Sequence, residues 1–377
     1  MKARKSPTSH TVYASSIFHP IQPAPGFDKK WLATHHLELL GVCEADCTFC
    51  STVMSTLHRM KKRLWAELAL QQRGVRLVYG KDHGLTVFYT DVIERLKAQL
   101  ERKRPSFGRG KTLMLSMLTD AFSPSLAEEG GTTRQALDLV LDRTEFRIRI
   151  LTKFDAVGDA YWVDYFAAHP GRFVVGLSTG TTDIDWARRV ELGTSSPADR
   201  LQALHRLQAA GVPTFGMLCP VFHDCLEGDA LKTLVDRVRP DLVEELWAEP
   251  YNDRSNWEQV RKGYRSGSQG EAWLTEVFEK RNLELWSNYA TELYLRLKEK
   301  ALAEGWLEKL RYLLYEIDVT KSDVARFGKM EGVLLQSRDE EGLSKNPHFR
   351  RKEAALKAWA TRRLSGLDLQ VLEQDST

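Results

Sequence analysis

Six short apolar runs recur along the first two thirds of this sequence, and most of them are separated by segments with a helical pattern. The runs cover residues 35–42, 112–118, 146–151, 172–178, 213–218 and 241–249. Repeated strand–helix–strand units pair their strands in parallel through right-handed crossovers. The repeat therefore predicts an α/β fold, either a six-stranded, partly closed β/α barrel or an open doubly wound sheet. In both architectures functional residues gather at the carboxyl ends of the strands.

The segments between and after these runs complete the expected organisation. Residues 131–144 and 196–211 have helical patterns, and in the second Ser196 can cap, Pro197 suits the first turn and Gly211 lies at the exit. The long insertion at 51–111 is expected to hold a helix over 55–73 and a strand or hairpin at 85–90. After about residue 260 the pattern is mainly helical. We therefore expect an N-terminal arm at 1–34, a barrel at 35–260 and a mainly helical C-terminal region at 261–377.

Polar and reactive residues follow each apolar run directly. Cys43 follows the first run. The second to sixth runs end, in order, in "TDAFSP", "TKFD", "STGTTD", "CPVFHDC" and "PYNDRSN". If the runs are parallel strands, these residues meet at one edge of the sheet.

Three of the five cysteines, Cys43, Cys47 and Cys50, lie within eight residues. So few and so clustered cysteines do not resemble an extracellular disulfide framework. The basic N-terminus has no apolar segment typical of a secretory signal, and no apolar run is long enough to span a membrane, so a cytoplasmic protein without membrane contact is expected.

Thiolates in a reducing compartment bind soft metals or react. Structural zinc would need a fourth ligand, such as His58, Cys219 or Cys225, whereas three cysteines on a [4Fe–4S] cluster would leave one iron open to a ligand.

The spacing Cys43-x3-Cys47-x2-Cys50, with Phe49 before the last cysteine and the loop leaving the first strand, resembles the radical S-adenosylmethionine (SAM) motif. The resemblance implies a partial (β/α)6 radical SAM barrel with a [4Fe–4S] cluster and SAM as cofactors. In that family SAM binds the open iron and is cleaved reductively to methionine and a 5′-deoxyadenosyl radical, which abstracts hydrogen from the substrate. It also implies a reductase, such as flavodoxin or ferredoxin, as electron donor.

A narrower resemblance covers roughly residues 35–225. The segments "ELGTSSPADRLQALHRLQAAGVPTFGMLCPV", "ILTKF" and "LTDAFSP" are similar to the spore photoproduct lyase and DNA repair photolyase-like branch. The resemblance implies that Lys153 and Ser178 help to hold SAM, and that Thr119 and Asp120 lie near its amino group. Two of these residues have simpler alternatives: Asp120 could cap the following loop, and Lys153 could pair with Asp155 or Asp183.

The resemblance fails at the hydrogen donors. The lyase uses a cysteine at the end of its second strand and a tyrosine just after the cluster motif, and this sequence has Leu118 and Ser51 there. The lyase reaction itself is therefore not expected. Cys219, after the fifth run, could donate hydrogen instead, or could be a small buried residue. Tyr251 and Arg254 could face the substrate, or could be loop residues paired with acidic neighbours.

Charge bears on the substrate. The net charge is +3, but residues 97–111 carry six basic residues and one acidic, and residues 345–363 carry seven and one. Such segments can neutralise phosphates, or can be solvated helix faces and a loop. A radical SAM enzyme acting on a nucleic acid or nucleotide is therefore the first hypothesis. The alternatives are a radical SAM enzyme for a small metabolite or peptide, and a zinc-stabilised nucleic-acid-binding protein without catalysis.

Overall fold

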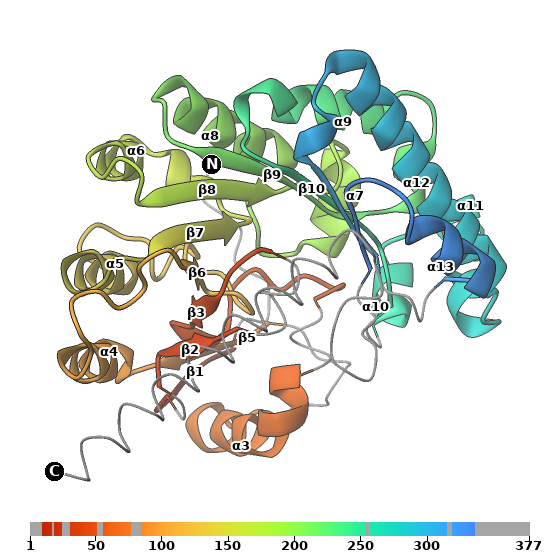
Figure 1. The fold of residues 1–377 in the computed structure, drawn as a ribbon. Coiled ribbons are helices and arrows are strands. Elements are labelled where there is room, and N and C mark those ends of the chain that lie inside the picture. Colours follow the sequence, from red (N-terminus) through yellow and green to blue (C-terminus); the bar gives the residue numbers. More distant parts are fainter. Residues whose placement is uncertain are drawn as a thin grey trace, which may run out of the picture.

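The computed structural model describes residues 10–16, 19–24, 31–50, 56–76, 84–253, 256–314 and 319–335. Within these ranges the chain forms one large curved sheet with helices packed on its outer side (Figure 1). The strands, in their order across the sheet, are β12 (Val333–Leu335), β11 (Leu310–Leu314), β10 (Leu246–Pro250), β9 (Thr214–Val221), β8 (Phe173–Ser178), β7 (Arg147–Thr152), β6 (Thr112–Leu115), β3 (His35–Leu37) and β2 (Ile21–Pro23). All neighbouring strands from β3 to β12 are parallel, and β2 is antiparallel to β3. This arrangement confirms the expected parallel β/α fold with a partly closed barrel.

The helices that follow the strands form an outer layer around the curved sheet (Figure 1). They are α4 (Val92–Glu101), α5 (Thr132–Arg143), α6 (Ala160–Ala167), α8 (Pro197–Ala209), α9 (Ala230–Val238) and α12 (Leu283–Glu304). The shorter helical elements are α7 (Ile184–Val190), α10 (Trp257–Arg261), α11 (Gln269–Leu274), α13 (Lys321–Phe327), η1 (Asp155–Gly158), η2 (His223–Leu226), η3 (Pro240–Leu242), η4 (Thr275–Glu279) and η5 (Leu307–Lys309). None of the helices in the described ranges is both long enough and apolar enough to cross a membrane.

Side chains of the central strands alternate between the two faces of the sheet. In β8, Phe173, Val175 and Leu177 pack outward into the main core, whereas Val174 belongs to the inner cluster of the barrel. The inner cluster also contains Phe215, Met217, Trp247, Leu313, Leu334 and Leu32. Because both faces of the central strands are covered, these strands appear in the sequence as nearly continuous apolar runs.

A small second sheet carries the cysteine loop. It consists of β1 (His10–Ala14), β5 (Leu85–Tyr89) and β4 (Leu40–Val42), with β5 in the middle. Helix α3 (Thr56–Arg73) contributes Trp65 and Ala69 to the apolar cluster beneath this sheet. The helix and the strand expected in the insertion at 51–111 are thus present.

The structure corrects three strand boundaries. The run at 241–249 is a strand only from Leu246, since η3 occupies its first two residues. The run at 35–42 is not one strand: it divides into β3 and β4, which belong to different sheets, and Glu38 lies between them. The run at 112–118 ends as a strand at Leu115, because Ser116 adopts a positive φ of 52° and turns the chain. The breaks after β3 and β6 are in contact, since the Glu38 carboxylate accepts hydrogen bonds from Leu118 N at 2.9 Å and Thr119 Oγ1 at 2.8 Å.

The helix predicted at 196–211 forms as α8 with the expected cap. Ser196 Oγ accepts a hydrogen bond from Asp199 N at 3.1 Å, Pro197 is the first helical residue and Gly211 has φ of 71°. The region after residue 260 contains the α-helices α11, α12 and α13 in its described part, and it also contributes β11 and β12, which extend the sheet. Those two strands were not expected from the sequence.

Candidate functional site

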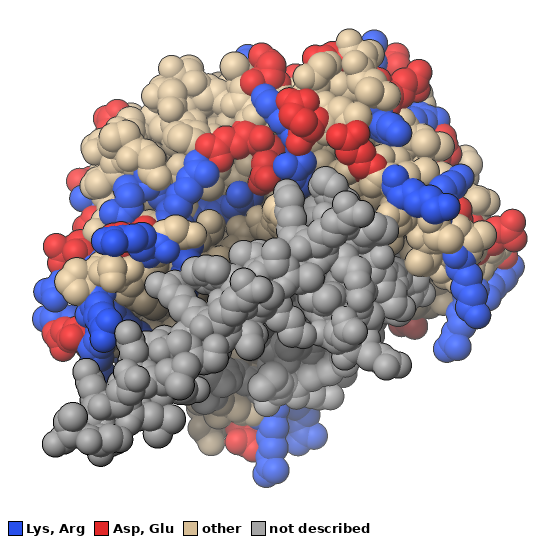
Figure 2. Space-filling model, in the orientation of Figure 1, with Lys and Arg blue, Asp and Glu red and all other residues tan. Residues whose placement is uncertain are grey.

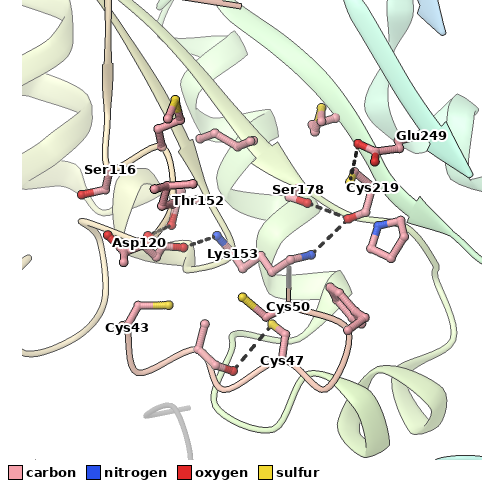
Figure 3. A pocket seen from close by; sticks show the side chains of 18 of the residues that line it. Cys43, Cys47, Cys50, Ser116, Asp120, Thr152, Lys153, Ser178, Cys219 and Glu249 are labelled. Carbon is pink, nitrogen blue, oxygen red and sulfur yellow. Dashed lines mark hydrogen bonds between the residues drawn. The ribbon is translucent and has the colours of Figure 1, made fainter. Parts of the chain in front are cut away.

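A cavity of about 280 Å³ lies where the strands of the barrel end (Figure 3). Its wall contains ten of the residues that the sequence singled out: Cys43, Cys47, Phe49, Cys50, Thr119, Asp120, Lys153, Ser178, Cys219 and Tyr251. They come from the cysteine loop and from the ends of β6, β7, β8, β9 and β10. Parallel pairing brings them together, as expected for the carboxyl edge of such a sheet.

The cysteine loop, residues 43–50, is held against the segment that links α7 to α8. Thr48 N donates to Val190 O at 2.8 Å, and Gly193 N donates to Ala45 O at 3.0 Å. Cys47 also forms an isolated antiparallel bridge with Glu191. A Cβ atom at Gly193 would collide with the carbonyl oxygen of Glu44, so only glycine allows this close approach. The Gly193-Thr194-Ser195-Ser196 turn therefore has a structural role: its first residue fixes the cysteine loop and its last caps α8.

Burial suppresses ionisation of two thiols in this loop, those of Cys43 and Cys47. It raises the pKa of Cys43 well above the usual value, with Cys50 and Asp120 adding to the effect. It also raises the pKa of Cys47, although the nearby Lys153 charge opposes the shift. Buried thiols of this kind become thiolates when a metal or cluster supplies compensating positive charge.

The donor set suits a cluster. Among the described side chains, no three His, Cys, Asp or Glu residues surround a point where one metal ion could bind. The three cysteines instead line one side of the cavity along a curved loop (Figure 3). In a [4Fe–4S] cluster each thiolate binds its own iron, so its ligands surround a body rather than a point. Three thiols with room beside them fit such a group.

Asp120 is a buried carboxyl at the centre of a hydrogen-bond network. Its Oδ1 accepts from Thr152 Oγ1 at 2.7 Å and Phe122 N at 3.0 Å, and its Oδ2 accepts from Lys153 N at 2.8 Å. Burial outweighs these bonds and raises the pKa of Asp120 to about 6. The bond from Phe122 N shows that Asp120 does cap the following loop, as the simpler alternative proposed, while it also lines the cavity.

Lys153 does not pair with Asp155 or Asp183, so both simpler alternatives were wrong. Its Nζ donates to Glu191 Oε1 at 2.7 Å and to Cys219 O at 3.3 Å, and it lies 5.2 Å from the centre of the Phe49 ring. An ammonium group has three donors. Lys153 lines the cavity, so it can also meet an anionic group that enters.

Cys219 stands on the wall of the cavity that β9 and β10 provide. Its thiol donates to Glu249 Oε2 at 3.6 Å, and Asn252 Nδ2 donates to Glu249 Oε1 at 3.0 Å. Its carbonyl oxygen accepts from Ser178 Oγ at 2.8 Å. Cys219 is half-buried and is accessible from the cavity, so it is not merely a small core residue.

The remaining predicted side chains are placed as follows. Thr119 lines the cavity, but its hydroxyl donates to Glu38. Tyr251 is 2% exposed, stacks on Phe222 and donates to Asn256 Oδ1 at 3.0 Å, so its hydroxyl is directed into the protein. Leu118 lines the cavity.

The sequence also singled out Cys225, Ser51 and Arg254. Cys225 is buried away from the cavity, and burial raises its pKa to about 12. Ser51 and Arg254 lie outside the described residues.

Glu191, Arg200 and Glu249 are functional candidates that the sequence reasoning missed. Arg200 had a usable signal, because it lies three residues after Pro197 and four before Leu204, on the apolar face of an amphipathic helix. A charged residue on that face needs a buried partner. Glu249 ends an apolar run, which is also a position for a carboxylate at the functional edge.

The basic segment at 97–111 does not rim the cavity. It precedes Thr112, the first residue of β6, whereas the cavity residues of this part of the chain are Met114 and residues 116–120, at and beyond the other end of that strand. Four strand residues separate the two ends by roughly 13 Å. On the face shown in Figure 2, basic and acidic side chains are interspersed. The second basic segment, 345–363, lies outside the described residues.

No model of a known protein family matches this sequence, and no curated protein matches it. Among solved structures, a mutant of spore photoproduct lyase matches over 67% of this chain and 66% of its own, with 16% identity and a TM-score of 0.44. A lyase mutant with bound AdoMet and dinucleoside spore photoproduct matches over the same shares, with 15% identity and a TM-score of 0.41. The structure of anSMEcpe with bound AdoMet matches over 72% of this chain and 60% of its own, with 11% identity and a TM-score of 0.41.

This chain thus spans just under two thirds of the length of these lyase chains. Spore photoproduct lyase belongs to the branch that the sequence motifs resemble. Because the identities are 16% or lower, we infer the function from this chain's own residues.

Proposed function

We propose that this protein is a radical SAM enzyme with a [4Fe–4S] cluster on Cys43, Cys47 and Cys50. The observation that carries the proposal is that the three thiols share one cavity with Asp120, Lys153 and Ser178, which supply the opposite charges and the hydroxyl that an amino acid cofactor needs. A carboxylate suits an ammonium group, and a lysine suits a carboxylate. When bound, the cluster and SAM would supply an electron transfer that generates a carbon radical.

The protein's own residues bind and enclose these groups. The three thiolates hold the cluster, the Lys153 ammonium receives a carboxylate, and Asp120 faces an amino group. Met114, Met117, Met217 and Leu151 give the rest of the wall an apolar character and so limit water around a reactive intermediate. Cys219 is held by Ser178 and Lys153 through its carbonyl oxygen and by Glu249 through its thiol. In this proposal it donates its thiol hydrogen atom to a substrate radical, so that the S–H bond breaks, a C–H bond forms and the unpaired electron passes to the Cys219 sulfur.

The test is anaerobic reconstitution followed by analysis of metal, sulfide and SAM products. Wild-type protein should hold close to four irons per chain, the count of one [4Fe–4S] cluster, and after reduction should form 5′-deoxyadenosine from SAM. Cys43→Ala, Cys47→Ala and Cys50→Ala should each lose both properties. Cys225→Ala is the matched control and should retain them. Stoichiometric zinc without iron in the wild type would instead favour the zinc-stabilised, non-catalytic alternative.

The substrate has two candidates. The motif resemblance supports a nucleic acid or nucleotide, but the position of 97–111 at the opposite edge of the sheet from the cavity favours a small metabolite or peptide. A salt titration separates them, because binding to duplex DNA weakens with a log–log slope of roughly −0.9 per phosphate contact. Arg102, Lys103 and Arg104 are exposed, and their joint replacement by Ala would lower that slope only if this segment binds phosphates.

Labelled candidates then identify the substrate directly. Label transferred from a candidate into 5′-deoxyadenosine marks it as the substrate. An unchanged slope in the triple variant, or binding no tighter than about millimolar at low salt, would assign the enzyme to the small-molecule class.

A further inference from the structure

A buried carboxylate is shared between two buried cations beside the cysteine loop. Glu191 Oε1 accepts from Lys153 Nζ at 2.7 Å and from Arg200 Nη1 at 3.3 Å, and Glu191 Oε2 accepts from Arg200 Nη2. The side chains of Arg200, Glu191 and Lys153 are 0%, 5% and 13% exposed. The two cations lower the pKa of Glu191 to about 2 in spite of its burial, so this carboxyl stays ionised.

Arg200 is fixed from a second direction, because its Nη1 also donates to Ser178 O at 2.6 Å. The guanidinium therefore links the end of β8 to Glu191. This leaves Lys153 as the one member of the trio that lines the cavity.

The trio lies directly against the loop that carries the cysteines. Glu191 and Cys47 are partners in an antiparallel bridge, and side chains of such partners leave the same face with their Cβ atoms about 5 Å apart. The loop itself is attached by backbone bonds, from Thr48 N to Val190 O and from Gly193 N to Ala45 O. The side chain of Glu191 is therefore not needed to hold the loop, and its ion pairs call for another explanation.

We propose that Glu191, Arg200 and Lys153 form a buried charge unit that sets the reduction potential of the cluster on Cys43, Cys47 and Cys50. This inference rests on the proposed function. Two cations and one carboxylate leave the unit with a net charge of +1. Reduction makes a cluster more negative, and net charge near the cluster is one of the determinants of its potential. Because the unit is buried, solvent and salt screen it weakly.

Glu191 acts here as a positioning residue. It joins Lys153 to Arg200, so the ammonium stays at the cavity wall and does not turn away from the like-charged guanidinium. Its own negative charge halves the positive charge that the two cations would otherwise present. Removing different members of the unit must therefore shift the potential in opposite directions.

The experiment is a redox titration of the reconstituted cluster, followed by the EPR signal of its reduced form, without SAM or substrate. Lys153→Gln should shift the midpoint potential to more negative values, because one cation is lost. Glu191→Gln should shift it to more positive values, because one anion is lost. Glu191→Gln combined with Arg200→Gln keeps the net charge at +1 and should return the potential toward that of the wild type. Asp142→Asn, an exposed surface change, is the control and should leave the potential in place.

Shifts of the midpoint potential in opposite directions distinguish this role from a purely structural one. A residue that only supports the fold would lower the iron content whatever the charge of its replacement. If Glu191→Gln does not fold, Lys153→Gln and the double variant Glu191→Gln/Arg200→Gln still test the inference. Neither of them leaves Lys153 and Arg200 both buried without the carboxylate between them. If the midpoint potential shifts in the same direction in all variants, or does not shift, this inference is overturned and the proposed function is not affected. A wild type that holds no cluster would overturn the proposed function and this inference with it.

Discussion

Asp120 gives a pH-dependent prediction whose size follows from its surroundings. Burial raises its pKa from 3.8 to about 6 in the native protein. The unfolded chain therefore loses this proton near pH 4 and the native chain near pH 6. Between these values the unfolded state binds fewer protons than the native state, so stability falls as pH rises. Below the unfolded value both states are protonated, and the group has no effect on the free energy of unfolding.

A shift of about two pKa units corresponds to about 3 kcal/mol of stability, all of it lost at neutral pH. About 2 kcal/mol of that loss falls between pH of about 4.5 and about 7.5, by the same linkage relation. Asp120→Asn cannot ionise and removes this pH dependence. It also turns one oxygen into an amide that faces the N–H of Phe122 or Lys153, at a cost of about 1–3 kcal/mol at every pH.

The measurement is urea unfolding of iron-free wild-type and Asp120→Asn protein at the two pH values. The free energy of unfolding of the wild type, relative to the variant, should be about 2 kcal/mol lower at the higher pH. Asp142→Asn removes an exposed carboxyl and should show no such change. If the free energy of unfolding of the wild type, relative to the variant, instead rises with pH, the reasoning fails. The three hydrogen-bond donors to Asp120 would then stabilise its carboxylate more than burial destabilises it.

Three further predictions follow from other contacts. Gly193→Ala should displace the cysteine loop, cost about 1–3 kcal/mol and lower the iron content, whereas Gly328→Ala, where a Cβ meets only ordinary contacts, should not. Spore photoproduct should not be restored efficiently to thymines, and efficient repair that survives Cys219→Ala would show that the donor positions are assigned wrongly. Ser196→Ala removes the bond from Asp199 N and should lower the free energy of unfolding by about 1 kcal/mol in urea titrations; no loss would mean that another group caps α8.

The parallel order of the strands could be predicted because each central strand is apolar on both faces. Phe173 to Ser178 are all buried, so the run is continuous and easy to find. The strands β11 and β12 were missed because they follow a region where helical periodicity dominates, and β12 has only three residues. Such a short segment has too few residues to show a period of two.

The residues of the cavity wall were predictable where they directly follow strands. Their hydrogen-bond partners were less predictable, because these come from distant parts of the sequence. Lys153 was found from its place after β7, but its partner Glu191 lies 38 residues away and reaches it only through the fold. No local pattern encodes that meeting. The break at Glu38 was missed for a similar reason, since its carboxylate is engaged by groups 80 and 81 residues later.

The attachment of the cysteine loop has a consequence for biosynthesis. Thr48 is held by Val190, 142 residues further along the chain. At a synthesis rate of about 5–20 residues per second, the cysteines leave the ribosome roughly 7–30 s before their support exists. During that interval the thiols are presented on nascent chain rather than in a cavity. For the cluster proposed above, iron and sulfide are therefore best delivered after β8, α7 and the following turn have been made, and a carrier that donates a preformed cluster to the folded chain would meet a completed site.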